Sequence, residues 1–216
     1  MNESVTKTPI DQNAKKPGTR IFLVRHGQPV QHSGKIFLGQ ADVPLSERGK
    51  GEAAAAGDEL LRLGARPKRV YASDLARAKE TADIIAQRLG GIPVLPGKLL
   101  REMAMGSWDG ELIEEIREKF PAEYAKRGDD LKNYRTPGGE NFYDLRGRVI
   151  REFHRILSED FRAAGGDPGD LVIVAHLGVI DVLSEEIHAD GGEGGAGRNC
   201  ATGSVTMLET PEWLML

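Results

Sequence analysis

The chain has 216 residues, enough for one globular domain, and its 39% hydrophobic and 29% charged content is typical of a domain with an apolar core. A formal net charge of −4 argues against nucleic acid as the main partner, since binding a phosphate backbone needs a clustered positive surplus. No apolar run approaches the roughly 20 residues of a membrane span, and the N-terminus lacks the apolar segment of a signal peptide. The single cysteine, Cys200, excludes an internal disulfide and favours a reducing compartment. We expect a cytoplasmic protein without a membrane partner, with a polar, disordered leader over residues 1–19.

Strand-like and helical patterns alternate along the rest of the chain. Apolar runs of strand length lie at residues 21–24, 69–72, 92–95, 171–175 and 204–208. Helical patterns lie between them, at residues 46–63, 73–90, 140–164 and 178–188. Ser73 or Asp74 is the expected N-cap of the second helix, and residues 106–139 are typical of an insertion of short helices and loop. The alternation predicts one α/β domain over residues 20–216, with a mostly parallel sheet covered by helices on both faces.

Polar side chains follow several of the expected strands. In an open α/β sheet, ligands bind outside the carboxyl ends of the strands. Arg25 and His26 follow the run at 21–24, and His176 follows the run at 171–175. Arg77 lies one helical turn after the end of the run at 69–72, and Glu102 comes after a short loop that follows the run at 92–95. The sequence therefore predicts that two arginines, two histidines and one carboxylate meet at one edge of the sheet.

This set of residue types suits a phosphate ester. Two guanidiniums offer paired donors that match the phosphate oxygens and never lose their charge. A neutral imidazole can act as the nucleophile and form a phosphohistidine, while a carboxyl group protonates the leaving oxygen and then takes a proton from water. The helix start at Leu177 would add backbone N–H donors. Neither a metal nor another cofactor is required for this chemistry.

The sequence leaves other interpretations of these residues open. His26, His176 and Glu102 could instead ligate a metal, although two flanking arginines would repel a cation. The glycine-rich segment 191–197 contains GEGGAG, which formally matches a dinucleotide-binding fingerprint. It follows a helix and precedes a strand, however, which is the reverse of the order that the fingerprint needs. We expect this segment to be a flexible surface loop.

Six ordered segments resemble the signature motifs of the histidine phosphatase superfamily, in its phosphoglycerate mutase-like branch 1. These segments are IFLVRHGQP (21–29), GQADVPLSERGKGEA (39–53), VYASDLARAKETA (70–82), LLREMAMGSWDG (99–110), TPGGENFYDLRGRV (136–149) and VIVAHLGVI (172–180). The resemblance extends over residues 20–209. It implies the three-layer α/β/α fold of that family.

The resemblance also implies a role for each matching residue. His26 would be the phosphorylated nucleophile, and Glu102 would be the proton donor. Arg25, Arg77 and His176 would form the rest of the phosphate pocket.

Three further positions concern the substrate. Gly39 matches a position whose backbone approaches the substrate phosphate in the family. Leu177 stands where glycine is commoner, and its backbone N–H is an expected phosphate donor. His32 stands where many mutases have an asparagine that helps to hold phosphate, so it is a candidate substrate-binding residue.

The function that follows is metal-independent hydrolysis of small phosphorylated metabolites through a phosphohistidine on His26. A phosphoglycerate mutase is the first alternative, but the family's mutases carry extra basic residues after the acid, whereas this chain continues with MAMGSWDG and the acidic ELIEEIREK. A non-catalytic phospho-ligand sensor is the second alternative, and it would be expected to lose the nucleophile or the acid. Specificity is expected to depend on the insertion, on His32 and on the glycine-rich loop.

Overall fold

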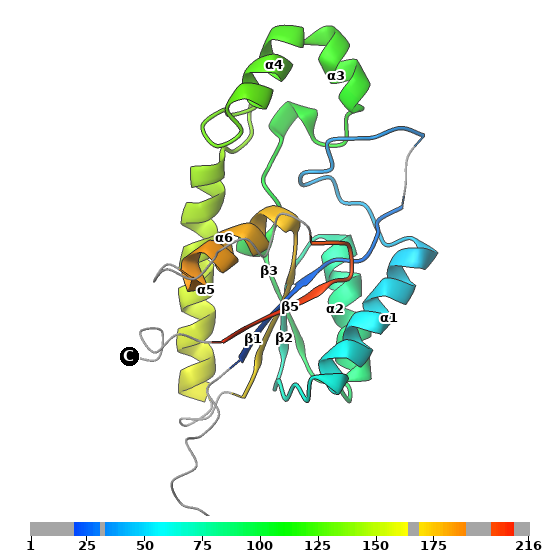
Figure 1. The fold of residues 1–216 in the computed structure, drawn as a ribbon, viewed down its shortest axis with the longest axis vertical. Helices are drawn as coiled ribbons and strands as arrows, with labels where there is room; N and C mark the ends of the chain where they lie inside the picture. Colours follow the sequence, from blue (N-terminus) through cyan, green and yellow to red (C-terminus); the bar gives the residue numbers. More distant parts are fainter. Residues whose placement is uncertain (1–19, 31–32, 164–168, 189–199, 210–216) are drawn as a thin grey trace, which may run out of the picture.

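The computed structural model describes residues 20–30, 33–163, 169–188 and 200–209, which form three layers (Figure 1). The central sheet consists of β1 (Arg20–Arg25), β2 (Val70–Ser73), β3 (Val94–Gly97), β4 (Leu171–Ala175) and β5 (Val205–Glu209). The strand order is β3-β2-β4-β1-β5, and β5 runs antiparallel to β1 while the other pairs are parallel. The predicted α/β class with a mostly parallel sheet is confirmed.

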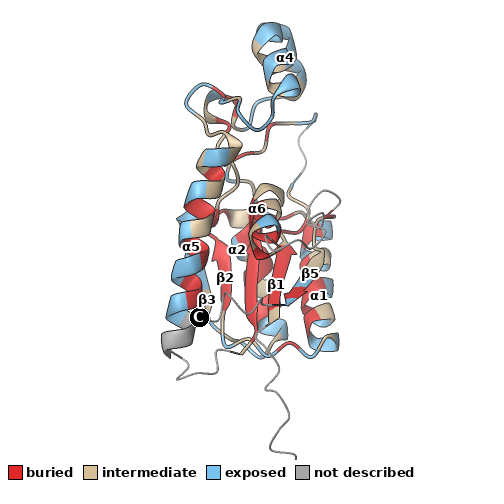
Figure 2. Cartoon of the chain, turned by 60° about the vertical axis from the view of Figure 1, so that its left-hand side comes forward, coloured by how far each residue is buried: buried red, intermediate tan, exposed pale blue. Residues whose placement is uncertain are grey.

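Helices cover both faces of this sheet. They are α1 (Glu47–Arg62) and α2 (Ala76–Arg88) on one face, and α5 (Phe142–Ala163) and α6 (Leu177–Ile187) on the other. Side chains of β1 alternate between the two layers, because successive residues of a strand point to opposite faces. Ile21 and Leu23 pack with α5 and α6, whereas Phe22 and Val24 pack with α1 and α2. Figure 2 shows the buried residues concentrated in the sheet and on the facing sides of the helices.

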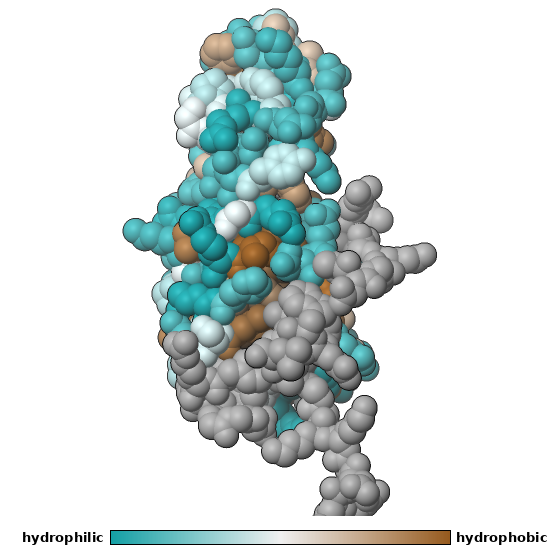
Figure 3. All heavy atoms as spheres, turned by 90° about the vertical axis from the view of Figure 1, so that its left-hand side faces the viewer, coloured by the Kyte–Doolittle hydropathy of each residue, from teal (hydrophilic) through white to brown (hydrophobic). Residues whose placement is uncertain are grey.

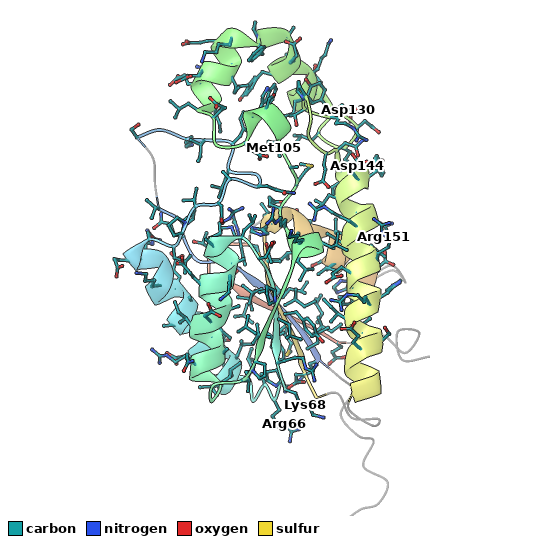
Figure 4. All side chains as sticks on the ribbon, turned by 180° about the vertical axis from the view of Figure 1, so that it is seen from behind. Arg66, Lys68, Met105, Asp130, Asp144 and Arg151 are labelled. Atoms are coloured by element: carbon teal, nitrogen blue, oxygen red, sulfur yellow. The ribbon has the colours of Figure 1, made fainter. Side chains whose placement is uncertain are left out.

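The insertion stands beyond the carboxyl ends of the parallel strands (Figure 1). It contains the 3-10 turn η2 (Gly106–Trp108), α3 (Ile113–Lys119) and α4 (Pro121–Asp129), and a first 3-10 turn, η1 (Lys98–Leu100), precedes it. A small core of its own packs Phe37, Met105, Trp108 and Ile116, with Met105 at its base in Figure 4. The helix α4 has no buried residue and projects from the body of the molecule (Figure 2).

The prediction that Ser73 or Asp74 caps the N-terminus of α2 is wrong. The cap position is Leu75, and neither Ser73 nor Asp74 caps the helix with its side chain. The Asp74 carboxylate is instead engaged in an ion pair with an arginine. Asp42 reaches in from a distant loop and accepts a hydrogen bond of 2.7 Å from the backbone N–H of Ala76. The Asp42 carboxylate therefore accepts a hydrogen bond from the start of α2, as the side chain of an N-cap residue normally does.

Three expectations concern residues outside the described ranges: the leader over residues 1–19, the role of His32, and the glycine-rich loop at 191–197. In the part of the chain that the structure describes, no helix is long and apolar enough to span a bilayer. The face shown in Figure 3 is mostly hydrophilic around a small apolar patch.

Candidate active site

Two histidines lie side by side at the carboxyl ends of neighbouring strands. Parallel pairing of β1 with β4 sets Arg25 opposite Ala175, and the next backbone N–H, that of His26, donates to the Ala175 carbonyl at 2.9 Å. His176 follows Ala175 directly, so its ring centroid lies 5.0 Å from that of His26. Both side chains are buried, with exposed fractions of 0% for His176 and 4% for His26. The register of one pair of strands thus brings the two imidazoles together.

Arg77 reaches the same place from the first turn of α2 and is fully buried. Its Nε donates to His26 Nε2 at 3.3 Å. Its Nη1 and Nη2 donate to the carbonyl oxygens of Ala41 and Gly39, at 2.8 and 2.7 Å. Arg77 therefore contacts the candidate nucleophile and fixes the loop that contains Gly39.

These contacts determine which nitrogen of His26 carries the proton. A guanidinium can only donate, so the nitrogen that faces Arg77, Nε2, must accept. The other nitrogen, Nδ1, lies 2.8 Å from the Gly27 carbonyl oxygen, which can only accept. His26 thus holds its proton on Nδ1 and presents an unprotonated Nε2 to the cavity.

Both imidazoles are neutral at neutral pH. Burial, reinforced by the positive charge of Arg77, lowers the pKa of His26 from 6.5 to about 3. Burial, followed by the influence of His26 and Arg77, lowers the pKa of His176 well below 6.5. A neutral His26 has the lone pair that a nucleophile needs without first losing a proton.

Several buried nitrogen atoms at this place have no hydrogen-bond partner among the described residues. Arg25 donates from Nη1 to the Cys200 carbonyl, but its Nε and both ring nitrogens of His176 make no hydrogen bond. Unpaired buried polar atoms cost free energy. A phosphate dianion bound between Arg25 and Arg77 would supply acceptor oxygens to the Arg25 Nε–H and to the one ring nitrogen of His176 that carries a proton.

Glu102 faces this group from the segment that follows β3. Its Oε1 accepts from the Met103 backbone N–H at 2.7 Å, and its Oε2 accepts from the Gly178 N–H at 3.2 Å. The second bond holds the carboxylate at the start of α6, where the helix presents free N–H groups. Gln40 also donates to the Glu102 carbonyl at 3.0 Å.

Arg148 on α5 is a buried residue that the sequence reasoning missed. Its two Nη atoms donate to the carbonyl oxygens of Leu99, Arg101 and Glu102, at 2.7 to 2.8 Å. It also forms a two-pronged ion pair with Glu140, at 2.7 and 2.8 Å. Nothing in the amphipathic pattern of the helix signals this role, because a single arginine on a helix is usually solvated.

A cavity of about 530 Å³ opens above these groups. The predicted site residues that line it are Arg25, His26, Gly39, Arg77, Glu102 and Leu177. His176 lies next to His26 without lining the cavity. The volume falls within the range of small-ligand sites. A phosphate at the base would leave room for the rest of a metabolite.

The insertion and α6 add charged residues that the sequence reasoning did not single out. Arg127 and Lys132 line the cavity from the side of the insertion, and Asp181 and Glu185 line it from α6. Glu123 lies four residues before Arg127, a spacing that predicts a surface ion pair. The guanidinium of Arg127 instead lies over an aromatic ring. The spacing of Glu123 and Arg127 therefore gives a misleading prediction for Arg127.

Among the residues that the structure describes, no cluster of three or more His, Cys, Asp or Glu side chains is arranged to hold a metal ion. A metal site on His26, His176 and Glu102 therefore finds no support in the geometry. The contact of Arg77 Nε with His26 Nε2 also sets a positive charge where such an ion would bind.

Comparison with known proteins agrees with this geometry. The family model for the histidine phosphatase superfamily (branch 1) matches residues 21–213. A glucosyl-3-phosphoglycerate phosphatase from Mycolicibacterium vanbaalenii is 34% identical over 167 residues, which are 76% of this chain and 72% of that protein. A probable phosphoglycerate mutase GpmB from Salmonella paratyphi C is 32% identical over 130 residues, 60% of this chain and 59% of that protein.

Solved structures show the same similarity. The native structure of a mycobacterial glucosyl-3-phosphoglycerate phosphatase superposes with a TM-score of 0.68 and 30% identity, over 80% of each chain. An α-ribazole phosphatase from Shigella flexneri has a TM-score of 0.72 over 88% of this chain and 90% of that chain. Its 23% identity supports the fold alone.

Proposed function

Because the chain belongs to the histidine phosphatase superfamily, branch 1, and is a phosphoric monoester hydrolase, we propose that it works through a phosphohistidine on His26. The observation that carries this proposal is the orientation of the His26 ring. Its Nδ1 is fixed on the Gly27 carbonyl, and its unprotonated Nε2 faces the cavity beside Arg77.

Substrate binding relies on fixed positive charge. Arg25 and Arg77 bind the phosphate oxygens, and the backbone N–H of Leu177 at the start of α6 adds a donor. The contact of Arg77 Nε with His26 is long for a hydrogen bond, at 3.3 Å, so the Nε–H can turn to a phosphate oxygen. His176 becomes more basic beside a bound dianion and then donates to it. These groups stabilise the negative charge of the transition state without a metal ion.

Two displacements complete the reaction. In the first, His26 Nε2 attacks phosphorus, the bond to the ester oxygen breaks, and Glu102 in its protonated form gives its proton to the leaving alkoxide. In the second, Glu102 takes a proton from water, the resulting hydroxide attacks phosphorus, and the bond to Nε2 breaks. Inorganic phosphate leaves, and both residues return to their starting states.

The substrate in this proposal is a small phosphomonoester of the cytoplasm. The cavity volume of about 530 Å³ suits a whole metabolite, and the single cysteine supports a reducing compartment. Glucosyl-3-phosphoglycerate is the first substrate to test, since a similar protein carries that name. We place the specificity in the insertion, which supplies one wall of the cavity.

Trapping of the phosphoenzyme tests the mechanism. Rapid acid-free denaturation during turnover of p-nitrophenyl phosphate should leave an acid-labile, alkali-stable phosphate on the protein. His26→Ala should abolish both this signal and turnover, while His154→Ala, at an exposed histidine of α5, should keep them. Turnover without any phosphoprotein would contradict the proposal. Binding of phosphate without hydrolysis of any ester would favour a sensor instead.

Mutase-type phosphoryl transfer is the second candidate, since a similar protein is named as a probable phosphoglycerate mutase. Incubation with 3-phosphoglycerate and a trace of 2,3-bisphosphoglycerate distinguishes the two. Release of free phosphate supports the phosphatase. Formation of 2-phosphoglycerate in excess of free phosphate would favour the mutase.

A further inference from the structure

The carboxylate of Glu102 lies closer to α6 than any side chain at the contact would allow. Gly178 is the second residue of α6, and its backbone N–H donates to Glu102 Oε2 at 3.2 Å. A Cβ built on Gly178 would lie 2.6 Å from Glu102 Oε1 and 3.0 Å from Leu145 Cδ2. A carbon and an oxygen that are not bonded to each other do not approach to 2.6 Å. Glu102 therefore occupies space that is free only because residue 178 has no side chain.

The oxygen that this Cβ would displace is already bound on its other side. Glu102 Oε1 accepts a hydrogen bond of 2.7 Å from the backbone N–H of Met103. It could move away from a methyl group on residue 178 only by lengthening that bond or by turning the carboxyl group away from α6. A methyl group on residue 178 would therefore change the position of the acid.

Glu102 also caps α6. The first N–H groups of a helix have no partner within the helix, and His176, at the N-cap position, makes no hydrogen bond to them with its side chain. Glu102 Oε2 accepts from one of these groups, where the positive end of the helix dipole favours negative charge. A protonated carboxyl group keeps acceptor capacity, so the contact can persist when Glu102 carries the proton for the leaving group.

Neighbouring N–H groups of α6 thereby serve the phosphate and the acid. In the proposed mechanism the Leu177 N–H donates to the phosphate, while the Gly178 N–H donates to Glu102. The two residues are consecutive, with their Cα atoms about 3.8 Å apart. One helix start thus fixes the distance between the phosphate and the group that protonates its leaving oxygen.

We propose that Gly178 is a positioning residue for the proton donor, because its missing side chain lets the Glu102 carboxyl group lie against the start of α6, within reach of the leaving oxygen. Gly178 acts through Glu102 and takes no part in the bond changes itself. The proposal rests on the proposed function and deepens it by naming the contact that sets the acid against the phosphate.

Gly178→Ala tests the proposal through the dependence of the rate on the leaving group. The displaced acid should protonate the leaving oxygen poorly, so kcat/KM for phenyl phosphate should fall by about tenfold or more. The loss for p-nitrophenyl phosphate should be much smaller, because nitrophenolate leaves with less protonation. In a series of substituted phenyl phosphates, log kcat/KM should fall more steeply with the pKa of the phenol in the variant than in the native protein. Damage to the fold alone would lower all rates by the same factor.

A double variant shows whether Gly178 acts through Glu102. Glu102→Gln already removes proton donation, so the addition of Gly178→Ala should have little further effect. We expect kcat/KM of the double variant for phenyl phosphate to lie within about twofold of that of Glu102→Gln, whereas independent effects would multiply.

Gly147→Ala is the matched control. Gly147 lies exposed on α5, and no atom lies within 4 Å of a Cβ built there. This variant should keep the native rates for every ester. Inhibition by inorganic phosphate should be unchanged in Gly178→Ala, since Gly178 contacts the acid rather than the phosphate. Circular dichroism checks that each variant is folded.

Failure of the positioning role differs from failure of the proposed function. Equal losses on all the esters, or a double variant worse than Glu102→Gln by the full effect of Gly178→Ala, overturn the role of Gly178 while phosphatase activity stands. If Gly178→Ala does not fold, Gly178→Ala/Glu102→Ala removes the clashing carboxylate and should restore folding, and a double variant that also fails to fold overturns the role. A native protein that hydrolyses none of these esters overturns the proposed function, and the role of Gly178 with it.

Discussion

Arg148 Nη2 donates a hydrogen bond of 2.8 Å to the carbonyl oxygen of Glu102. The same buried guanidinium binds the carbonyl oxygens of Leu99 and Arg101 and pairs with Glu140. The backbone that carries the candidate proton donor is therefore held from α5 at three points. Arg148 acts as a positioning residue, since it touches the acid only through the backbone.

Replacement of Arg148 should impair proton donation more than phosphate binding. We expect Arg148→Met to lower kcat for alkyl phosphates by about tenfold or more, since a small displacement of a catalytic group is costly, with little change in KM. The loss for p-nitrophenyl phosphate should be smaller, because nitrophenolate leaves with less protonation. Steady-state kinetics with both ester types measures the difference.

A variant on the same helix serves as the control. Arg151→Met removes an exposed arginine of α5 (Figure 4) and should leave both substrates unaffected. Arg148→Met also removes buried ion pairing, so its melting temperature should fall. Equal losses of kcat on both esters would show that Arg148 supports the fold alone.

Glu102→Gln tests the acid itself. The amide keeps the shape of the side chain but cannot give up a proton as a carboxylic acid does. We expect kcat for alkyl phosphates to fall by about 10²- to 10⁴-fold, the usual share of a general acid, and kcat for p-nitrophenyl phosphate to fall much less. If the two esters lose activity equally, Glu102 is not the proton donor.

The sequence predicted the central sheet well where burial is complete. The apolar run at 171–175 coincides with β4, which is buried at every position. The run at 92–95 is displaced by two residues from β3, which spans Val94–Gly97. β3 is an edge strand, so its bounds depend on its pairing with β2 rather than on its own hydrophobicity.

The sequence predicted those site residues that directly follow a strand. His26 and His176 follow strands directly, so parallel pairing alone brings them together. Arg148 and Arg127 could not be found in the same way. Their partners are backbone carbonyls and an aromatic ring far away in the chain, and such contacts have no signature in local spacing.

Removal of metal ions should leave the activity unchanged. The positive charge at the base of the cavity comes from Arg25, Arg77 and the start of α6, which EDTA does not remove. We expect full hydrolysis of p-nitrophenyl phosphate after dialysis against EDTA, measured as released nitrophenolate. Loss of activity that added Mg²⁺ or Zn²⁺ restores would contradict the metal-independent mechanism.

Acid should destabilise the fold through His26. The pKa of His26 is about 3 in the folded protein and about 6.5 in an unfolded chain. Between these values the unfolded chain binds a proton that the folded protein does not, so the free energy of unfolding falls as the pH falls below 6.5. From pH 7.5 to pH 5.5 this histidine accounts for a loss on the order of 1 kcal/mol.

Urea unfolding at the two pH values measures this loss. On acidification, the free energy of unfolding of His26→Asn should fall less than that of the native protein, by on the order of 1 kcal/mol, because the titrating group is absent. His154→Asn, at an exposed site, should behave as the native protein does. Identical losses in all three proteins would contradict the lowered pKa of His26.

Gly39→Ala should damage the loop that Arg77 holds. Gly39 has a φ of +41°, and a Cβ there would lie 1.8 Å from Asp109 Oδ1. That oxygen accepts hydrogen bonds from the backbone N–H groups of Gln40 and Met105, so it cannot move away without losing them. We expect a loss of about 1–3 kcal/mol in unfolding free energy. We also expect a fall of at least about tenfold in kcat/KM, because the loop lines the phosphate pocket.

Gly51→Ala provides the matched control. Gly51 lies exposed in the second turn of α1, and no atom lies within 4 Å of a Cβ built there. Alanine at this position should raise the unfolding free energy by about 0.5–1 kcal/mol, since glycine is a poor helix former, and leave the kinetics unchanged. Denaturant unfolding and steady-state assays of both variants measure these effects. Native kinetics in Gly39→Ala would contradict the expectation that a side chain at position 39 distorts the phosphate pocket.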